Sequence, residues 1–316
     1  MNESNEKKFF LRDSIGNAIV DIGESNEDIV LVSANVLASC KVAGALDKYP
    51  ERVFTVGIAE QNMISFAAGL AREGKKAYTF TMAPFMSMRA CEQVRTDVAY
   101  NKLDVKMVAP YAGVSGGISG ATHWAIEDCG IMNSISGMIV LEPSDPIQAR
   151  EMVKATEKMY GPIYIRIGIE PVPQIYPRNY QYTIGKADYP IEGKDGAVIC
   201  SGVIVKYAIL ASKRIKKEYD KEIMVVDMHT IKPIDKVAVE KAAKTGHVLV
   251  AQDHNKIGGL GQMVATVLAE NGWGIRFKIL GLPDYFVKMA HAPYLYHKYG
   301  YDDEGIYLEM KHMLGL

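Results

Sequence analysis

The stretch "VGIAEQNMISFAAGL", residues 56–70, has the sequence pattern of a buried helix and carries a carboxylate at the start of that helix. From residue 61 onward, apolar side chains recur at helical spacing and fill neighbouring positions as well, which predicts a helix buried on most sides. Glu60 stands where that helix begins. One interpretation is structural, because acidic side chains are favoured in the first turn of a helix. The alternative is a catalytic carboxylate, and the rest of the sequence has to distinguish the two.

The composition excludes several classes of protein. The chain has 316 residues, enough for two domains, and a net charge of -1, which argues against non-specific nucleic-acid binding. No unbroken apolar run reaches the roughly 18 residues of a membrane span, and "MNESNEKKFF" at the N-terminus lacks the apolar core of a signal peptide. The cysteines are scattered with no CxxC pair, so we expect a reduced, cytoplasmic protein without a zinc site.

Short β-rich runs alternate with helical patterns along the chain. In the first half the runs occupy residues 28–34, 76–82, 104–110, 138–143 and 162–168. Such alternation predicts a doubly wound α/β domain with a parallel sheet, and we place it at residues 1–172.

A segment with four prolines and no helical period, ending at Pro190, interrupts this alternation. We therefore expect a linker at 173–190 and a second, smaller α/β domain with a mostly parallel sheet at 191–316. Its strands are expected at 195–202, 222–228, 247–253 and 276–282, with helices at 205–218, 236–245 and 261–270.

Three stretches together resemble a known family. They are "RVFTVGIAEQNMISFAAGLA" (52–71), "GATHWAIEDCGIMNSISGMIVLEPSDP" (120–146) and "MVVDMHTIKPID" (224–235), the last followed by "AQDHNKIGGLG" (251–261). Their order and spacing resemble those of the transketolase family of thiamine-diphosphate enzymes. The resemblance covers almost the whole chain, but only the last two domains of the family. It implies a pyrimidine-binding domain followed by a transketolase C-terminal domain.

The family's diphosphate-binding domain carries a Gly-Asp-Gly motif, and this sequence contains none. The resemblance therefore implies that an N-terminal partner subunit holds the diphosphate and its Mg²⁺ or Ca²⁺, with no metal ligands in this chain. It also implies a dimer of heterodimers, since the family's active sites form between domains of different units.

The resemblance assigns cofactor contacts to four residues. Glu60 matches the glutamate that hydrogen-bonds a ring nitrogen of the aminopyrimidine and favours its imino tautomer, which favours catalysis over capping. Phe85 falls where the family stacks a phenylalanine on that ring, although an ordinary core phenylalanine is the alternative. Met82 would line the same slot. Asn35 stands where relatives have an Asp near the cofactor.

A second group of residues matches positions that contact substrate. His123 corresponds to a histidine directed at the reacting centre and is expected to be catalytic. Arg12, Ser39 and Arg166 match positions that bind sugar phosphates, and a guanidinium suits phosphate or sulfonate. Tyr111 and Ser119 also correspond to substrate-contacting positions, but they depart from the family, which has His and Asp there.

We therefore expect the C-terminal subunit of a two-chain transketolase that transfers a two-carbon ketol unit from a ketose phosphate, or a related anionic ketose, to an aldose. The changes at Tyr111 and Ser119 favour a modified or sulfonated sugar over the usual pentose phosphates, or they are drift at constant specificity. The alternative activity is that of a beta-type subunit of a 2-oxo-acid dehydrogenase or of an acyloin-forming enzyme. A regulatory protein without activity is disfavoured by Glu60 and Phe85.

Overall fold

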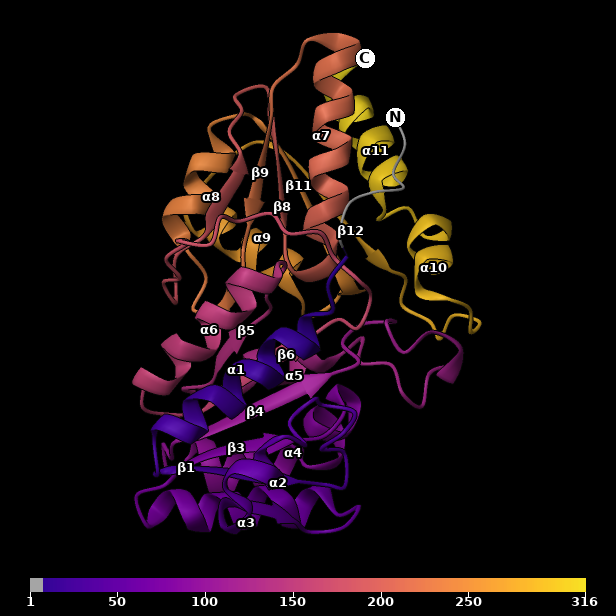
Figure 1. Ribbon diagram of the computed structural model, residues 1–316. Helices are drawn as coiled ribbons and strands as arrows, with labels where there is room; N and C mark the ends of the chain where they lie inside the picture. The colour runs from indigo at the N-terminus through magenta and orange to yellow at the C-terminus, as the bar shows by residue number, and fades with distance from the viewer. Residues whose placement is uncertain (1–7) are drawn as a thin grey trace.

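The computed structural model describes residues 8–316, which form two α/β units, the N-terminal one below the C-terminal one in Figure 1. The first unit contains a seven-stranded sheet and the second a five-stranded sheet. Within each sheet every strand pairing is parallel except one at an edge. The expected pair of doubly wound α/β domains is confirmed.

The first sheet contains all five strands that the sequence predicted, and two more at its edges. In spatial order its strands are β10 (Thr230–Lys232), β5 (Ile139–Leu141), β6 (Ile163–Ile167), β4 (Val105–Pro110), β3 (Lys76–Phe80), β1 (Ile29–Ser33) and β2 (Val53–Thr55). The unexpected strand β10 comes from the second half of the chain and runs antiparallel to β5. The second half of the chain therefore adds an edge strand to the first sheet.

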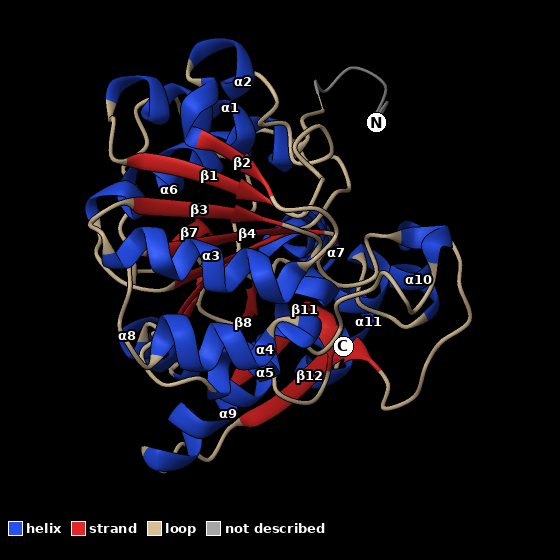
Figure 2. Ribbon diagram, turned by 90° about the horizontal axis from the view of Figure 1, so that it is seen from below, coloured by secondary structure: helices blue, strands red, loops and turns tan. Residues whose placement is uncertain are grey.

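Helices cover both faces of this sheet because successive strand residues alternate between two apolar cores. Ile29 and Leu31 face one core, and Val30 and Val32 face the other. The first core is covered by α1 (Leu11–Ser25) and α6 (Pro146–Lys158). The second is covered by α3 (Glu60–Arg72), α5 (Asp128–Ser134) and two π-helical segments (Phe85–Arg89 and Val94–Ala99), which the short helix α4 (Cys91–Gln93) connects. Figure 2 shows α3 running alongside the strands. The short helix α2 (Ala45–Lys48) precedes β2.

The helix α3 is buried on one side only, which corrects the expectation drawn from its apolar sequence. Met63, Ile64 and Ala67 pack against the sheet. Phe66 on the opposite side remains 39% exposed, and Ile58 just before the helix is 75% exposed. The solvent side of α3 carries Gln61, Asn62 and Ser65. Phe66 lies at the edge of that side, and its ring centroid is 5.4 Å from that of Phe54.

The second unit follows the sequence prediction closely up to residue 282. Its sheet has the order β12 (Arg276–Leu282), β11 (His247–Asn255), β8 (Gly196–Cys200), β9 (Ile223–Asp227) and β7 (Asp188–Ile191). Its helices are α7 (Val205–Tyr219), α8 (Lys236–Ala243), α9 (Leu260–Glu270), α10 (Ala292–Lys298) and α11 (Asp303–Leu314). The expected linker, 173–190, contains no helix, and its last residues begin β7.

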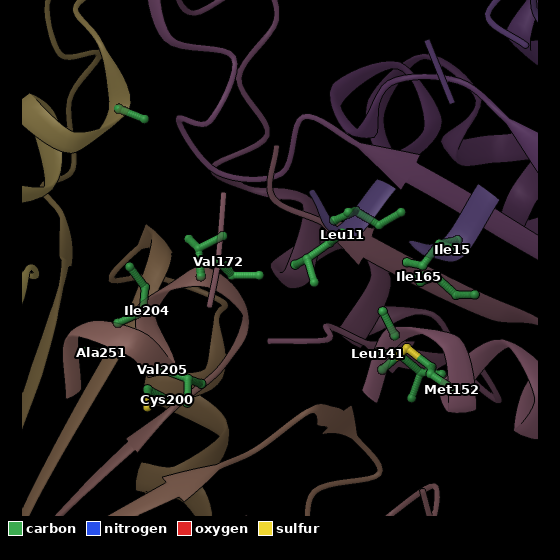
Figure 3. Close-up of a cluster of buried hydrophobic side chains, with 14 of the residues drawn as sticks. Leu11, Ile15, Leu141, Met152, Ile165, Val172, Cys200, Ile204, Val205 and Ala251 are labelled. Carbon is green, nitrogen blue, oxygen red and sulfur yellow. The ribbon is translucent and has the colours of Figure 1, made fainter. Parts of the chain in front are cut away.

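One apolar core continues from the first unit into the second. The cluster in Figure 3 includes Leu11 and Ile165 of the first unit and Cys200 and Val205 of the second, with Val172 of the connecting segment also in it. All five side chains are fully or almost fully buried. The two units are therefore held together by core packing as well as by strand β10, which the second half of the chain adds to the first sheet.

A buried carboxylate adds polar contacts at the same junction. Asp227 Oδ2 accepts hydrogen bonds from Ser144 Oγ at 2.5 Å, Tyr176 OH at 2.7 Å and Gln148 Nε2 at 2.9 Å. Ser144 and Gln148 belong to the first unit, whereas Asp227 ends β9 of the second. Burial raises the pKa of Asp227 to about 7, and the nearby Asp188 charge acts in the same direction.

This raised pKa predicts a pH-dependent stability. The folded state binds the Asp227 proton more tightly than the unfolded state, so its stabilising effect is present at low pH and is lost as the pH rises through about 7. In Asp227→Asn, the free energy of unfolding should fall less between pH 5 and pH 8 than in the wild type, by about 1–3 kcal/mol. Urea unfolding at several pH values measures this difference. The exposed control Asp284→Asn should keep the wild-type pH dependence, and identical profiles for both variants would contradict the prediction.

Candidate active site

Glu60 is the first residue of α3, and its side chain is only 2% exposed. Its carboxylate is held by two other segments. Thr81 Oγ1 donates to Oε1 at 3.3 Å, and Arg89 Nη1 donates to Oε2 at 2.9 Å. No side-chain hydrogen bond caps α3. Glu60 therefore does not serve the helix N-terminus, and its buried carboxylate lies beyond the carboxyl ends of the parallel strands β1 and β3, where α/β proteins bind ligands.

An aromatic ring lies beside this carboxylate. Phe85 opens the first π-helical segment, a helix form that is frequent at functional sites. The Arg89 guanidinium lies over the Phe85 ring, 4.2 Å from its centroid. On another side, the Phe85 and His123 rings meet nearly at right angles with centroids 5.4 Å apart. Glu60, Arg89, Phe85 and His123 therefore form one continuous group.

His123 lies on a glycine-rich loop that the second unit supports. Gly113, Gly117 and Gly120 adopt positive φ angles of 60°, 54° and 72°. Under the loop, the Asp253 carboxylate at the end of β11 accepts from the backbone N–H of Val114 at 3.1 Å. A Cβ atom at Gly113 would lie 2.1 Å from the Asp253 carboxyl carbon, so only glycine fits there.

The other predicted site residues make no hydrogen bond to Glu60 and no ring contact with Phe85 in the structure. Met82 is half-buried beside Thr81, and Asn35 is exposed just beyond β1 with a φ of 63°. Tyr111 and Ser119 belong to the His123 loop. Arg12 and Ser39 lie near one another, because α1 packs against the turn at Cys40, yet the structure shows no contact between them and Glu60.

Arg166, which was expected to bind a sugar phosphate, is used inside the protein in this structure. Its side chain is 0% exposed, and all of its nitrogen atoms donate within the protein. Nε donates to Asp128 at 2.8 Å, Nη1 to Glu142, and Nη2 to the carbonyl oxygens of Ala125 and Asp253. These acceptors enclose the guanidinium, which is not accessible to a substrate anion in this structure. The prediction considered the strand-end arginine alone and overlooked the two buried carboxylates that it pairs.

Thr81 and Arg89 were not anticipated. Thr81 directly follows β3, and Arg89 stands four residues after Phe85, so its side chain falls on the same helical face. That spacing was a signal available in the sequence. What the sequence could not show is that Arg89 turns toward α3.

Comparison with known proteins identifies the family. Residues 7–170 match the transketolase pyrimidine-binding domain, and residues 185–306 match the transketolase C-terminal domain. This chain belongs to the transketolase family. It is 37% identical over 298 residues to a transketolase C-terminal section of Methanocaldococcus jannaschii, covering 94% of this chain and 93% of that protein.

Two further relatives also match this chain over nearly the full length of both proteins. A 6-deoxy-6-sulfo-D-fructose transketolase subunit of a Clostridium species is 36% identical over 304 residues, covering 95% of this chain and 94% of the relative. A solved split-gene transketolase, described as an inactive beta4 tetramer, matches with a TM-score of 0.87 and 34% identity over 98% of this chain and 99% of that chain. These relatives confirm the expected thiamine-diphosphate-dependent transketolase subunit that acts with a partner, over the beta-type alternative.

Among residues 8–316, no helix is long and apolar enough to cross a membrane.

The Arg166 contacts in this transketolase subunit predict a large effect of substitution. Arg166→Met should lower the free energy of unfolding by about 3–5 kcal/mol, because it leaves the carboxylates of Asp128 and Glu142 buried without their cation. Arg166→Lys should lose nearly as much, since an ammonium cannot reach both carboxylates and the two carbonyl oxygens together. Urea denaturation of the full chain measures both. The exposed Arg95→Met is the control, and a loss below about 1 kcal/mol in Arg166→Met would contradict the buried ion-pair assignment.

Proposed function

We propose that this transketolase subunit binds the aminopyrimidine of thiamine diphosphate through Glu60 and Phe85, with Met82 and Asn35 bordering the ring. The observation that carries the proposal is the buried Glu60 carboxylate, which Arg89 links to the face of the Phe85 ring. The residues fit this group, because a carboxylate can accept a hydrogen bond from a ring nitrogen while an aromatic face stacks on the ring. When bound, thiamine diphosphate supplies the carbon nucleophile that carries the two-carbon unit.

His123 is proposed to act on the substrate. Its Nδ1 is within hydrogen-bond distance of Thr122 Oγ1, at 2.9 Å, which helps to fix the ring orientation. Nε2 has no hydrogen-bond partner within the described part of the chain and can bond a substrate oxygen. The edge contact with Phe85 keeps the imidazole beside the proposed cofactor position. The His123 ring can therefore bond and orient the carbonyl or hydroxyl oxygen of a sugar.

An N-terminal partner subunit is proposed to cover the outer side of α3 and to hold the diphosphate with Mg²⁺ or Ca²⁺. Ile58, Phe66 and Met88 surround the Glu60 region and are 75%, 39% and 43% exposed, as expected of a protein interface. Among residues 8–316, the cluster with metal-ligand spacing is Asp128, Cys129 and His254. Since Arg166 already donates to Asp128 there, a cation at that position would be repelled.

The test of this proposal is the variant Glu60→Gln, mixed with the partner subunit, Mg²⁺ and thiamine diphosphate. Exchange of the thiazolium proton of the bound cofactor should slow by roughly 10²–10³-fold, because an amide does not share a proton with the ring nitrogen as a carboxyl does. The folded state should survive, since the amide retains an acceptor for Thr81. Wild-type exchange rates in Glu60→Gln would reject the catalytic assignment.

The isolated chain provides the second arm of this experiment. It should bind thiamine diphosphate weakly and show no ketol transfer. We also expect a dimer of heterodimers with the partner and, by analogy with the solved relative, self-association without it. Ketol transfer by this chain alone would reject the proposed division of the site between two chains.

For the substrate, we propose an anionic ketose such as a sulfonated or otherwise modified sugar. Ser119 is exposed on the His123 loop, and Tyr111 at its start offers a hydroxyl donor. Arg12 is the candidate cation for the distal anion, because its Nε is buried without a hydrogen-bond partner among the described residues. Ser39 lies near it. The sulfofructose transketolase subunit among the relatives supports this substrate class.

A panel of ketose donors tests the substrate proposal. The reconstituted enzyme should prefer 6-deoxy-6-sulfo-D-fructose or another modified ketose over xylulose 5-phosphate, and Ser119→Asp should shift the preference by about tenfold, because a carboxylate adds a strong hydroxyl acceptor and repels anions. Values of kcat/KM for each donor provide the measurement. Ser119→Ala separates the loss of the hydroxyl from the added charge. A wide preference for xylulose 5-phosphate that Ser119→Asp leaves unchanged would reject the proposal.

A further inference from the structure

Arg89 makes two contacts that the proposed function assigns to the pyrimidine ring. Its Nη1 donates to Glu60 Oε2 at 2.9 Å, and its Cζ lies 4.2 Å from the centroid of the Phe85 ring. The first contact uses an acceptor atom of the proposed catalytic carboxylate. The second covers a face of the aromatic ring that is proposed to stack on the cofactor.

The two groups also resemble one another chemically. A guanidinium is planar and presents N–H donors at its edge, so it can stack on an aromatic face and bond a carboxylate at once. An aminopyrimidine protonated on its ring nitrogen is likewise a flat group with N–H donors at its edge. Glu60 and Phe85 therefore offer the same pair of contacts to either group.

The surroundings of Arg89 allow it to leave. The Arg89 side chain is 48% exposed, whereas Glu60 is 2% exposed. Apart from Glu60 and Phe85, the Arg89 guanidinium makes no hydrogen bond, ion pair or ring contact within the described residues. Rotation of the Arg89 side chain into solvent would thus break the hydrogen bond to Glu60 and the ring contact with Phe85.

We propose that Arg89 competes with the pyrimidine ring of the cofactor for Glu60 and Phe85, and that it must turn away before the ring can bind. This inference rests on the proposed function and adds a competitor to the same site. A residue that merely supported Glu60 would need the carboxylate contact alone. The simultaneous stacking of the Arg89 guanidinium on Phe85 is what favours competition.

Competition lowers the apparent affinity in a predictable way. Suppose that the chain binds the ring only while Arg89 is turned away. The apparent dissociation constant then equals the intrinsic constant divided by the fraction of molecules in which Arg89 is turned away. Arg89→Met keeps the apolar stem and removes the guanidinium. We expect it to bind thiamine diphosphate about tenfold more tightly and to associate with it faster. Arg89→Lys should lie between Arg89→Met and the wild type, since an ammonium can pair with Glu60 but cannot stack flat on Phe85.

The experiment uses the full chain assembled with its partner subunit in the presence of Mg²⁺. Isothermal titration calorimetry measures the Kd of thiamine diphosphate, and stopped-flow fluorescence measures the association rate. A second titration uses only the thiazole diphosphate half of the cofactor, which lacks the pyrimidine ring. The Kd of that half should be the same in Arg89→Met and in the wild type. Arg72→Met, an exposed arginine at the far end of α3, is the matched control and should leave both Kd values unchanged.

The outcomes separate this inference from the proposed function. If the wild type and Glu60→Gln bind thiamine diphosphate no more tightly than its thiazole half, the pyrimidine site itself is wrong and the inference fails with it. If the pyrimidine ring does add affinity, but Arg89→Met binds the whole cofactor equally or more weakly than the wild type, only the competition is overturned. Arg89 would then be a supporting residue of Glu60. The competition would also be overturned if Arg89→Met gained as much affinity for the thiazole half as for the whole cofactor, because the thiazole half does not reach Glu60.

Discussion

The buried guanidinium of Arg166 is the interaction on which the arrangement of this subunit depends. Within the first unit it pairs with Asp128 and Glu142, and it also donates to the Asp253 carbonyl of the second unit. Glu142 in turn accepts from Ser201 and Gln252 of the second unit, at 2.6 Å and 3.0 Å. A buried ion pair is favourable only when such additional hydrogen bonds satisfy both partners. Because the second unit supplies several of them, the ion pairs are stable only while the two units remain docked.

This junction also sets the shape of the site. Asp253, whose carbonyl oxygen binds Arg166, uses its carboxylate to hold the Val114 N–H and thereby the loop that carries His123. Burial raises the pKa of Asp253 to about 7, and the Arg166 charge acts in the opposite direction. The second unit therefore positions the loop whose His123 ring packs against Phe85. A change deep in the junction is expected to reach the substrate through this loop.

The sequence predicted the regular part of this fold well, because strands buried on both faces read as continuous apolar runs. Strands β1 and β11, for example, fall within a residue or two of their predicted limits. It did not predict β10, whose three residues pair with a sheet far away in the sequence, nor the π-helical geometry around Phe85. At the site, motif resemblance brought Glu60, Phe85 and His123 together. The buried ion pairs of Arg166 were not predicted, because the sequence pattern of an arginine in a strand is the same whether its guanidinium reaches solvent or internal carboxylates.

The exposed side of α3 and the Glu60–Arg89 pair have a common physical origin. A subunit that presents half of a binding site must keep a desolvated carboxylate and apolar side chains at a surface that its partner later covers. An unpaired carboxylate in such a place is costly, and Arg89 satisfies it with a side chain that remains half in solvent. If the proposed cofactor and partner both favour the state in which Arg89 is turned away, each raises the affinity for the other by the same factor. The contacts of Arg89 thus oppose cofactor binding by an amount that the partner interface and the pyrimidine ring together can overcome.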